Sequence, residues 1–171
     1  MVWVRKEYAG ELAVTFTWLS ALLPWGASWV KGTLGEGVTV TVVNVRFVFF
    51  QFHYLFGISF GKQPLAGLVQ FVHEIPGYVP NNQRLEGWLW LGAATVYLGL
   101  LLLSVAFYVD EERVTEALPV DPVRLFGAVL GGVGLVLMAV SVMLFSHQTT
   151  IPIGAVFMTV FGALLLRVER T

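Results

Sequence analysis

The sequence predicts an all-α membrane protein with four transmembrane helices and a long extracytoplasmic loop that contains short β-strands and an amphipathic helix. Of its 171 residues, 57% are hydrophobic and only 12% are charged, and the mean hydropathy is +0.77. An ordinary soluble domain has about 45–50% apolar and about 25% charged residues. Four apolar runs come close to the length of about 20 residues that crosses a hydrocarbon core. We expect residues 1–171 to form a single integral membrane domain.

The first apolar run covers residues 8–25 and follows Arg5 and Lys6. Its one acidic residue, Glu11, lies within the first turn of the predicted helix. A charged opening before an apolar stretch also resembles a signal peptide. We expect this stretch to be retained as a membrane anchor.

The other three runs follow in the second half of the chain. The second, residues 87–109, opens with tryptophans and closes with a tyrosine, as segments that end at a membrane interface do. The third, residues 125–145, follows Asp121 and Pro122, an N-cap residue and a residue favoured at the first helical position. The fourth, residues 151–166, is short and should form a tight antiparallel hairpin with the third.

The distribution of Lys and Arg predicts the orientation, because cationic residues near span ends resist translocation. The cationic residues on one side are Arg5, Lys6, Arg113, Arg124, Arg167 and Arg170. Those on the other side are Lys31 and Arg84 near the spans, with Arg46 and Lys62 further away. We therefore predict a multi-pass protein of the plasma membrane with both termini in the cytoplasm.

Residues 26–86 form the predicted extracytoplasmic insertion. The turn-rich stretch 32–37 precedes alternating valine and threonine in residues 38–43, a pattern typical of a β-hairpin. Residues 44–60 read as one aromatic strand at or above the interface, since unpaired backbone groups are not satisfied in hydrocarbon. A reentrant excursion of this strand is the alternative. Residues 64–74 read as an amphipathic helix on the membrane surface.

The aromatic strand is the candidate interaction surface, because exposed apolar patches mark protein or membrane contacts. Its aromatic members are Phe47, Phe49, Phe50, Phe52, Tyr54 and Phe56. In a continuous strand, Arg46 would share a face with Phe50, and Gln51 and His53 would lie on the other face.

Glu11 is the clearest ionisable residue inside a predicted span, and such residues are costly in a membrane. We expect an ion pair between Glu11 and an arginine at a neighbouring helix end; the candidates are Arg113, Arg124 and Arg167. A role in transport or proton relay is the alternative.

Small residues on the last two spans predict close helix packing. The glycines of the third span are Gly127, Gly131 and Gly134, and the small residues of the fourth are Ala155, Thr159 and Ala163. Whether these surfaces pack within one chain or between two chains stays open.

The sequence offers no catalytic motif, cofactor motif or metal-ligand spacing. It contains no cysteine, which excludes disulfides, thiolate metal sites and dithiol chemistry. No two of His53, His73 and His147 have the three- or four-residue spacing of a local metal site. The net charge of −1 and the lack of a basic run exclude a nucleic-acid backbone as a natural partner. We therefore predict no catalytic residues, no metal and no cofactor.

Three stretches carry a family resemblance. They are VRKEYAGELAV near the start, VRFVFFQFHYLFGISF in the loop, and EERV followed by PVDPVRLFGAVLG before the third span. Together they resemble a family of uncharacterised multi-spanning membrane proteins of halophilic archaea. The resemblance covers most of the chain and implies a source, but it implies no activity.

These observations predict a small non-enzymatic integral membrane protein. We expect a structural or accessory subunit that contacts membrane lipids, other membrane protein subunits or further copies of itself. One alternative is a small oligomeric transporter or channel. The other is a redox accessory protein that binds an isoprenoid or a quinone.

Overall fold

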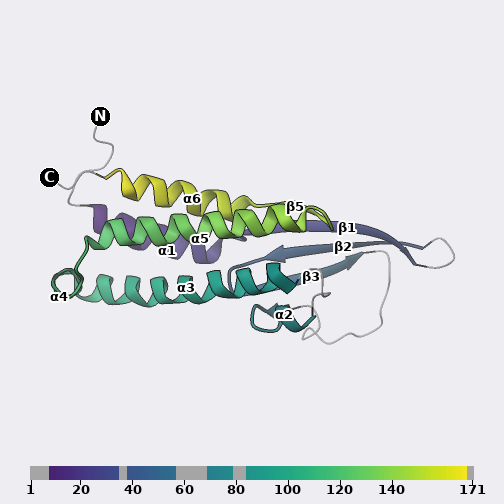
Figure 1. The fold of residues 1–171 in the computed structure, drawn as a ribbon, viewed down its shortest axis with the longest axis horizontal. Helices are drawn as coiled ribbons and strands as arrows, with labels where there is room; N and C mark the ends of the chain where they lie inside the picture. Colours follow the sequence, from purple (N-terminus) through teal and green to yellow (C-terminus); the bar gives the residue numbers. More distant parts are fainter. Residues whose placement is uncertain (1–7, 35–37, 57–68, 79–83, 169–171) are drawn as a thin grey trace.

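The computed structural model describes residues 8–34, 38–56, 69–78 and 84–168. Within these ranges a bundle of helices carries a β-sheet at one end and a short helix at the other (Figure 1). We call the two ends of the bundle the sheet end and the α4 end. The helices are α1 (Ala9–Leu22), α2 (Ile75–Tyr78), α3 (Arg84–Val109), α4 (Glu111–Ala117), α5 (Pro122–Leu144) and α6 (Ile153–Leu166).

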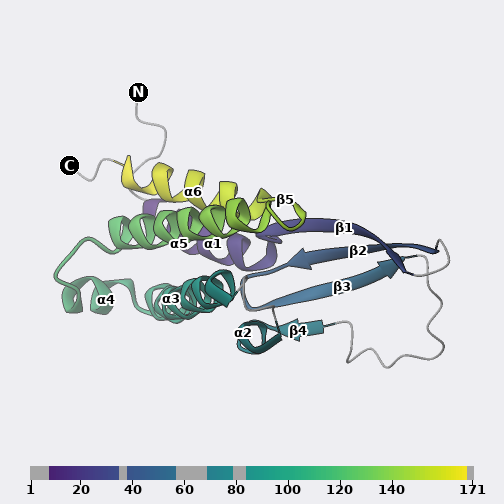
Figure 2. The same cartoon turned by 45° about the vertical axis from the view of Figure 1, so that its right-hand side comes forward.

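The sheet is antiparallel throughout and has the strand order β4-β3-β2-β1-β5. Its strands are β1 (Gly26–Leu34), β2 (Val38–Arg46), β3 (Phe50–Phe56), β4 (Val69–Phe71) and β5 (Thr149–Ile151). The strands β1, β2 and β3 project away from the helices, while β5 links α5 to α6 beside β1 (Figure 2). Ser28 lies opposite both Asn44 and Thr150, so segments from distant parts of the chain meet in one row.

The predicted all-α class with four spans is wrong. The segment between α1 and α3 supplies four strands, and a fifth comes from the link between α5 and α6. In the described part of the chain, α3 and α5 are long and apolar enough to cross a membrane. The helices α1 and α6 have 14 residues each, which corresponds to about 21 Å against a hydrocarbon core of about 30 Å.

A proline explains why α1 is shorter than the apolar run that contains it. Leu23 directly precedes Pro24, and the residue before a proline is disfavoured in the helical region. Leu23 accordingly adopts an extended conformation with ψ 135° and ends the helix. At the other side of the sheet, Pro152 stands at the N-cap of α6.

The loop predictions have mixed outcomes. The hairpin is confirmed, because β1 pairs with β2 along its whole length. The continuous strand 44–60 is wrong in its described part: the chain reverses after Arg46, and the Phe47 N–H donates to the Phe50 carbonyl at 2.7 Å; residues 57–60 lie outside the described residues. The described part of the predicted helix 64–74 contains the strand β4 instead; residues 64–68 lie outside the described residues.

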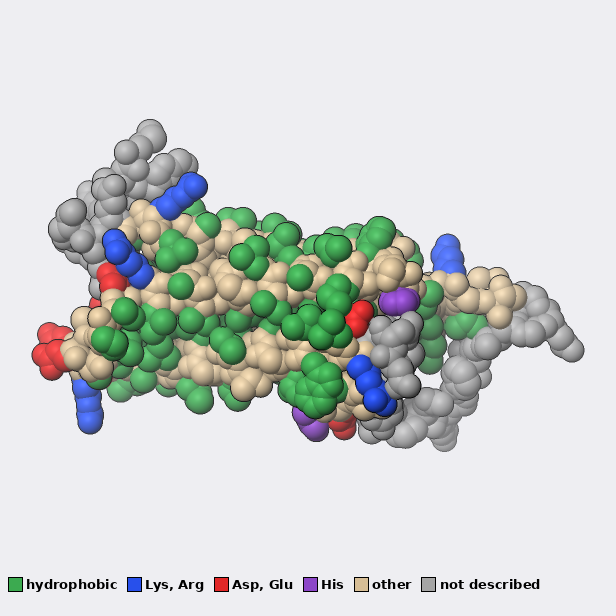
Figure 3. Space-filling model, viewed as in Figure 1, with side chains coloured by type: hydrophobic (Ala, Val, Ile, Leu, Met, Phe, Trp, Pro, Cys, Tyr) green, Lys and Arg blue, Asp and Glu red, His purple; other side chains and the backbone are tan. Residues whose placement is uncertain are grey.

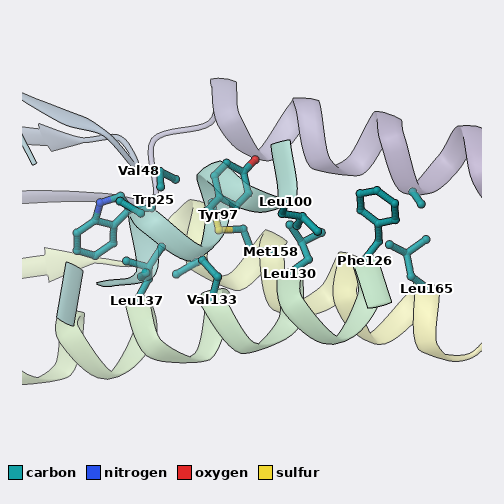
Figure 4. Close-up of a cluster of buried hydrophobic side chains, with 14 of the residues drawn as sticks. Trp25, Val48, Tyr97, Leu100, Phe126, Leu130, Val133, Leu137, Met158 and Leu165 are labelled. Atoms are coloured by element: carbon teal, nitrogen blue, oxygen red, sulfur yellow. The ribbon is translucent and has the colours of Figure 1, made fainter. Parts of the chain in front are cut away.

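The start of α5 agrees with its sequence signal. The Asp121 carboxylate accepts a hydrogen bond from the Val123 N–H at 2.8 Å, and Pro122 occupies the first turn. Leu130 and Leu137 of α5 are fully buried against side chains of α3 and α6 in the cluster of Figure 4. On α3, the Tyr97 hydroxyl in this cluster donates to the Thr17 carbonyl of α1.

Glycines let α5 and α6 approach closely. A Cβ at Gly127 would lie 3.0 Å from the Gly162 carbonyl, and one at Gly134 would lie 2.6 Å from Thr159 Oγ1. A Cβ at Gly131 would lie 3.7 Å from the Gly162 Cα. All three glycines that the sequence singles out therefore face α6 of the same chain.

Candidate functional site

A cluster of polar side chains fills one face of the sheet where it meets the helices. Because directly paired residues of an antiparallel sheet share a face, the strand register brings six of these side chains together, and the seventh, Gln148, comes from the turn after α5. We call them the polar cluster: Ser28, Asn44, Arg46, Gln51, His53, Gln70 and Gln148.

Arg46 lies at the end of β2 nearest the helices and connects two neighbouring strands. Its Nη1 donates to Ser28 Oγ of β1 at 2.8 Å, and its Nε donates to Gln51 Oε1 of β3 at 3.2 Å. The guanidinium carbon also lies 6.0 Å from the centre of the Trp25 ring. Neutral acceptors and an aromatic face therefore surround this positive charge.

The remaining bonds extend the cluster across the sheet. Asn44 Nδ2 donates to Gln148 Oε1 at 3.3 Å, and Ser28 Oγ donates to the same oxygen at 3.2 Å. On the other side, His53 Nδ1 contacts Asn44 Oδ1, and His53 Nε2 lies 2.7 Å from Gln70 Oε1. The cluster thus joins β1, β2, β3 and β4 to the segment that follows α5.

Burial sets the electrostatics of Arg46. The side chain is 5% exposed, and burial lowers its pKa from 12.5 to about 10, so it stays protonated at neutral pH. Among the residues that the structure describes, no carboxylate lies within ion-pair distance of it. A buried charge of this kind needs its neutral hydrogen-bond partners to remain in place.

The polar cluster lies beside the first turns of α3 and does not extend past the first residue of that helix. Trp90 of α3 donates from Nε1 to the Val48 carbonyl at 2.8 Å, and its ring lies 5.4 Å from that of Trp25. Arg46 contacts the same Trp25 ring. It therefore lies level with Trp90, six residues from the first residue of α3, which is about 9 Å along the helix axis.

Two buried groups near this level have unmatched hydrogen-bonding atoms among the described residues. Trp25 Nε1 and Glu86 Oε2 are both buried without a partner there. Glu86 is 6% exposed and stands one turn before Trp90 on the same side of α3. Arg46 and Glu86 are functional candidates that the sequence analysis missed.

The opposite face of the sheet carries a group of exposed apolar side chains. Phe56 and Phe71 are 57% and 52% exposed, and Trp29, Tyr54 and Ile151 are also exposed. We call this surface the aromatic face. On the helices, hydrophobic side chains lie along the bundle, and charged side chains gather towards its two ends (Figure 3).

The predicted interaction surface divides into parts with different roles. Phe47 stacks on Phe50 with 4.8 Å between ring centroids, and Phe50 lies 5.3 Å from Phe52, so these rings form an ordered group beside Tyr54. Phe49 points the other way, because its half-buried ring lies 6.0 Å from that of Tyr97 in the bundle. It contributes to the core instead of the aromatic face.

The predicted ion-pair residues all lie at the α4 end. Glu11 lies in the first turn of α1, and Arg124 lies in the first turn of α5. Arg113 lies in α4, and Arg167 is the C-cap residue of α6. All four side chains are exposed. The pairing stays a prediction, and any pair there would be solvated rather than buried.

The histidines are separated by their surroundings. His53 belongs to the polar cluster, His73 stacks on Phe71 at 6.0 Å, and His147 lies in the turn after α5. The described residues contain no group of three or more His, Cys, Asp or Glu side chains that could hold a metal ion. A separate apolar groove of about 360 Å³ runs between α3 and α5, past Gly92 and Gly132.

One family model matches residues 2–170 and is described as a family of unknown function, DUF7549. The chain belongs to this family. No curated protein matches the sequence. Because the description of DUF7549 names no activity, the function of this member has to be argued from its own geometry.

Proposed function

We propose that this DUF7549 protein is a small non-enzymatic integral membrane protein, an accessory subunit that contacts another membrane protein through the aromatic face. The observation that carries the proposal is the inverted character of the sheet. On one face the polar cluster is buried or half-buried and bonded together, while on the other face Trp29, Tyr54, Phe56 and Phe71 are exposed. A sheet in water normally has the opposite arrangement.

The level of the sheet supports a membrane setting for the aromatic face. Phe52, Tyr54 and Phe56 lie one, three and five residues beyond the row of Arg46 and Gln51, so at about 3.3 Å per residue they lie about 3, 10 and 17 Å further out. The first residue of α3 lies about 9 Å beyond that row. If α3 spans the membrane, the aromatic face covers the outer hydrocarbon and the headgroup layer, where aromatic residues are favoured.

The proposed topology has α3 and α5 crossing the plasma membrane as an antiparallel pair. The helices α1 and α6 pack beside them with exposed apolar side chains, and each is shorter than the hydrocarbon core. Arg113, Arg124 and Arg167 at the α4 end favour a cytoplasmic location for that end, against Lys31 and Arg84 at the sheet end. Both termini would then be cytoplasmic.

The proposed origin of the protein in halophilic archaea is supported by the sequence resemblance described above. We assign the chain to a multi-spanning family of halophilic archaea on the charged opening, the aromatic loop and the DPVR helix start. The transporter alternative and the isoprenoid alternative stay untested predictions.

A protein partner is favoured by the order of the aromatic rings. Rings that are already stacked lose little conformational freedom on binding, and aromatic residues are enriched in the buried centres of protein interfaces. Lipid acyl chains do not require ordered aromatic rings on the surface that they contact. Strands β4 and β5 are the outermost strands of the described sheet.

Site-specific crosslinking in native membranes tests this proposal. A photo-reactive phenylalanine analogue replaces Tyr54 in one variant and Leu55 in a matched control. Both residues are 43% exposed and adjacent in β3, but they lie on opposite faces of the sheet. We expect one discrete protein adduct at position 54 and none at position 55.

The identity of the adduct decides between the candidate partners. A single different membrane protein would support an accessory role when the same partner copurifies in mild detergent, whereas adducts with a second copy of this chain alone would contradict that role. Lipid adducts alone at position 54, or equal protein adducts at both positions, would contradict the proposal.

A further inference from the structure

An open cleft lies beside β1 at the sheet end. Its volume is about 470 Å³, and it forms because β5 pairs with only Ala27–Trp29 of β1. Beyond Trp29, the edge of β1 is one wall of the cleft and the turn after α5 is the other. The lining residues are Trp29, Val30, Lys31, Phe145, Ser146, His147, Gln148 and Thr149.

The charge of the lining favours an anion. Lys31 is exposed and cationic, and the lining residues include no Asp or Glu. Ser146, His147 and Thr149 add hydroxyl and imidazole groups that can donate hydrogen bonds.

The adjacent end of α5 does not offset this charge with free carbonyl groups. The last carbonyls of the helix, from Ser141 to Leu144, all accept hydrogen bonds from the backbone N–H groups of the following turn. Lys31 is therefore the dominant charge at the cleft.

The level of the cleft matches that of phospholipid headgroups. Lys31 lies five residues beyond Gly26, which is paired with Arg46, and thus about 17 Å beyond the row of Arg46. That is about 8 Å past the first residue of α3, and the headgroup layer on each side of the hydrocarbon is about 5–8 Å thick. Phe145, which is 62% exposed, lines the cleft at the end of α5.

We propose that this cleft binds the headgroup of an anionic phospholipid, with Lys31 contacting the phosphate and Trp29 and Phe145 lying against the lipid below it. The inference rests on the proposed membrane embedding and adds a specific lipid site to it. Flexible lysine side chains bind phosphate as point charges and reach the headgroup layer by extending along apolar surface.

Lipid retention by the intact protein tests the site. The protein is reconstituted in nanodiscs that contain phosphatidylcholine and phosphatidylglycerol at three to one. After the protein is released from the nanodiscs, the lipids that stay bound to it are identified by native mass spectrometry. We expect wild-type protein to retain phosphatidylglycerol preferentially. Lys31→Gln should lower that preference about five-fold, as expected for one cationic side chain at a membrane surface.

A matched control separates the cleft from general surface charge. Arg84 is an exposed cation at the same end of the molecule, outside the cleft, so Arg84→Gln should keep the preference. Equal loss in both variants, or no preference in wild-type protein, would overturn the assignment. Displacement of the lipid by millimolar inorganic phosphate would show a simple anion site and would also overturn it.

This result can be distinguished from a failure of the membrane proposal. A chain that does not insert would fail to enter nanodiscs at all, whereas an inserted chain without the lipid site would enter them and retain both lipids equally. Lys31 is exposed near the open edge of β1, so its replacement should leave the thermal unfolding midpoint unchanged.

Discussion

Arg46 shows how one residue can hold the sheet and the helices together. Its guanidinium bonds two strands and lies against Trp25, whose ring contacts Trp90 of α3. The desolvation of this charge lowers its pKa and costs stability. The cost is offset while Ser28 and Gln51 accept its hydrogen bonds.

Removing the guanidinium should therefore leave buried acceptors without partners. We expect Arg46→Ala to lower the free energy of unfolding by about 2–4 kcal/mol, since each unmatched buried group costs about 1–3 kcal/mol. Denaturant unfolding in detergent micelles measures the change. The exposed control Arg84→Ala should change stability by less than about 0.5 kcal/mol. Equal effects of the two variants would show that the polar cluster does not stabilise the fold.

The polar cluster could not be assembled from the sequence, and the reason lies in one turn. Residues 47–49 are Phe-Val-Phe and include no Gly, Pro, Asn or Asp that would mark a reversal. Without the turn, alternation places Arg46 with Phe50. With the turn, Arg46 lies opposite Gln51, and the polar residues share a face. The alternation of Phe50, Phe52, Tyr54 and Phe56 within β3 was predictable from the sequence.

At the scale of elements, α5 and α6 depend on glycine at their crossing. A Cβ at Gly162 would lie 2.5 Å from the Gly131 backbone nitrogen, a distance that only a backbone shift could relieve. The sequence pattern predicted small residues on both helices. It indicated Ala163 in place of the buried Gly162, because a four-residue repeat drifts slightly from the helical period.

A pair of glycine substitutions tests this crossing. We expect Gly162→Ala to lower the free energy of unfolding by about 1–3 kcal/mol, the usual cost of overpacking. Gly99→Ala introduces the same methyl group on α3, where no atom lies within 4 Å of the Cβ position, and should leave stability unchanged or slightly raised. Thermal unfolding in detergent compares them. A drop for Gly99→Ala as large as that for Gly162→Ala would argue against a packing origin.

The positions of the helices were predictable from apolar runs, but their lengths were not. The runs that became α3 and α5 kept almost their full extent, and Asp121 marked a helix start correctly. The run that became α1 was cut by Pro24, and Ile151, the first residue of the fourth run, became the last residue of β5. Hydropathy measures apolar content over a window and does not separate a helix from the strand that follows it.

At the scale of the whole molecule, the fold combines an apolar bundle with a sheet that buries its polar face. The pairing of β1 with β5 joins the first loop to the last, so both halves of the chain contribute strands to the sheet at the end of the bundle. This long-range pairing is not visible in local sequence patterns, because β5 has only three residues. The pairing adds the fifth strand to the four strands that the first loop supplies.

In the proposed topology, α3 and α5 cross a membrane and hold the sheet on the outer side. The chain contains no cysteine, so a single introduced thiol reports one position. Thr33 in β1 and Thr115 in α4 are exposed threonines at the two ends of the molecule. The measurement is labelling of Thr33→Cys and Thr115→Cys in intact cells with a membrane-impermeant maleimide. We predict labelling at position 33 in intact cells and at position 115 only after permeabilisation; labelling of both positions in intact cells would contradict the account.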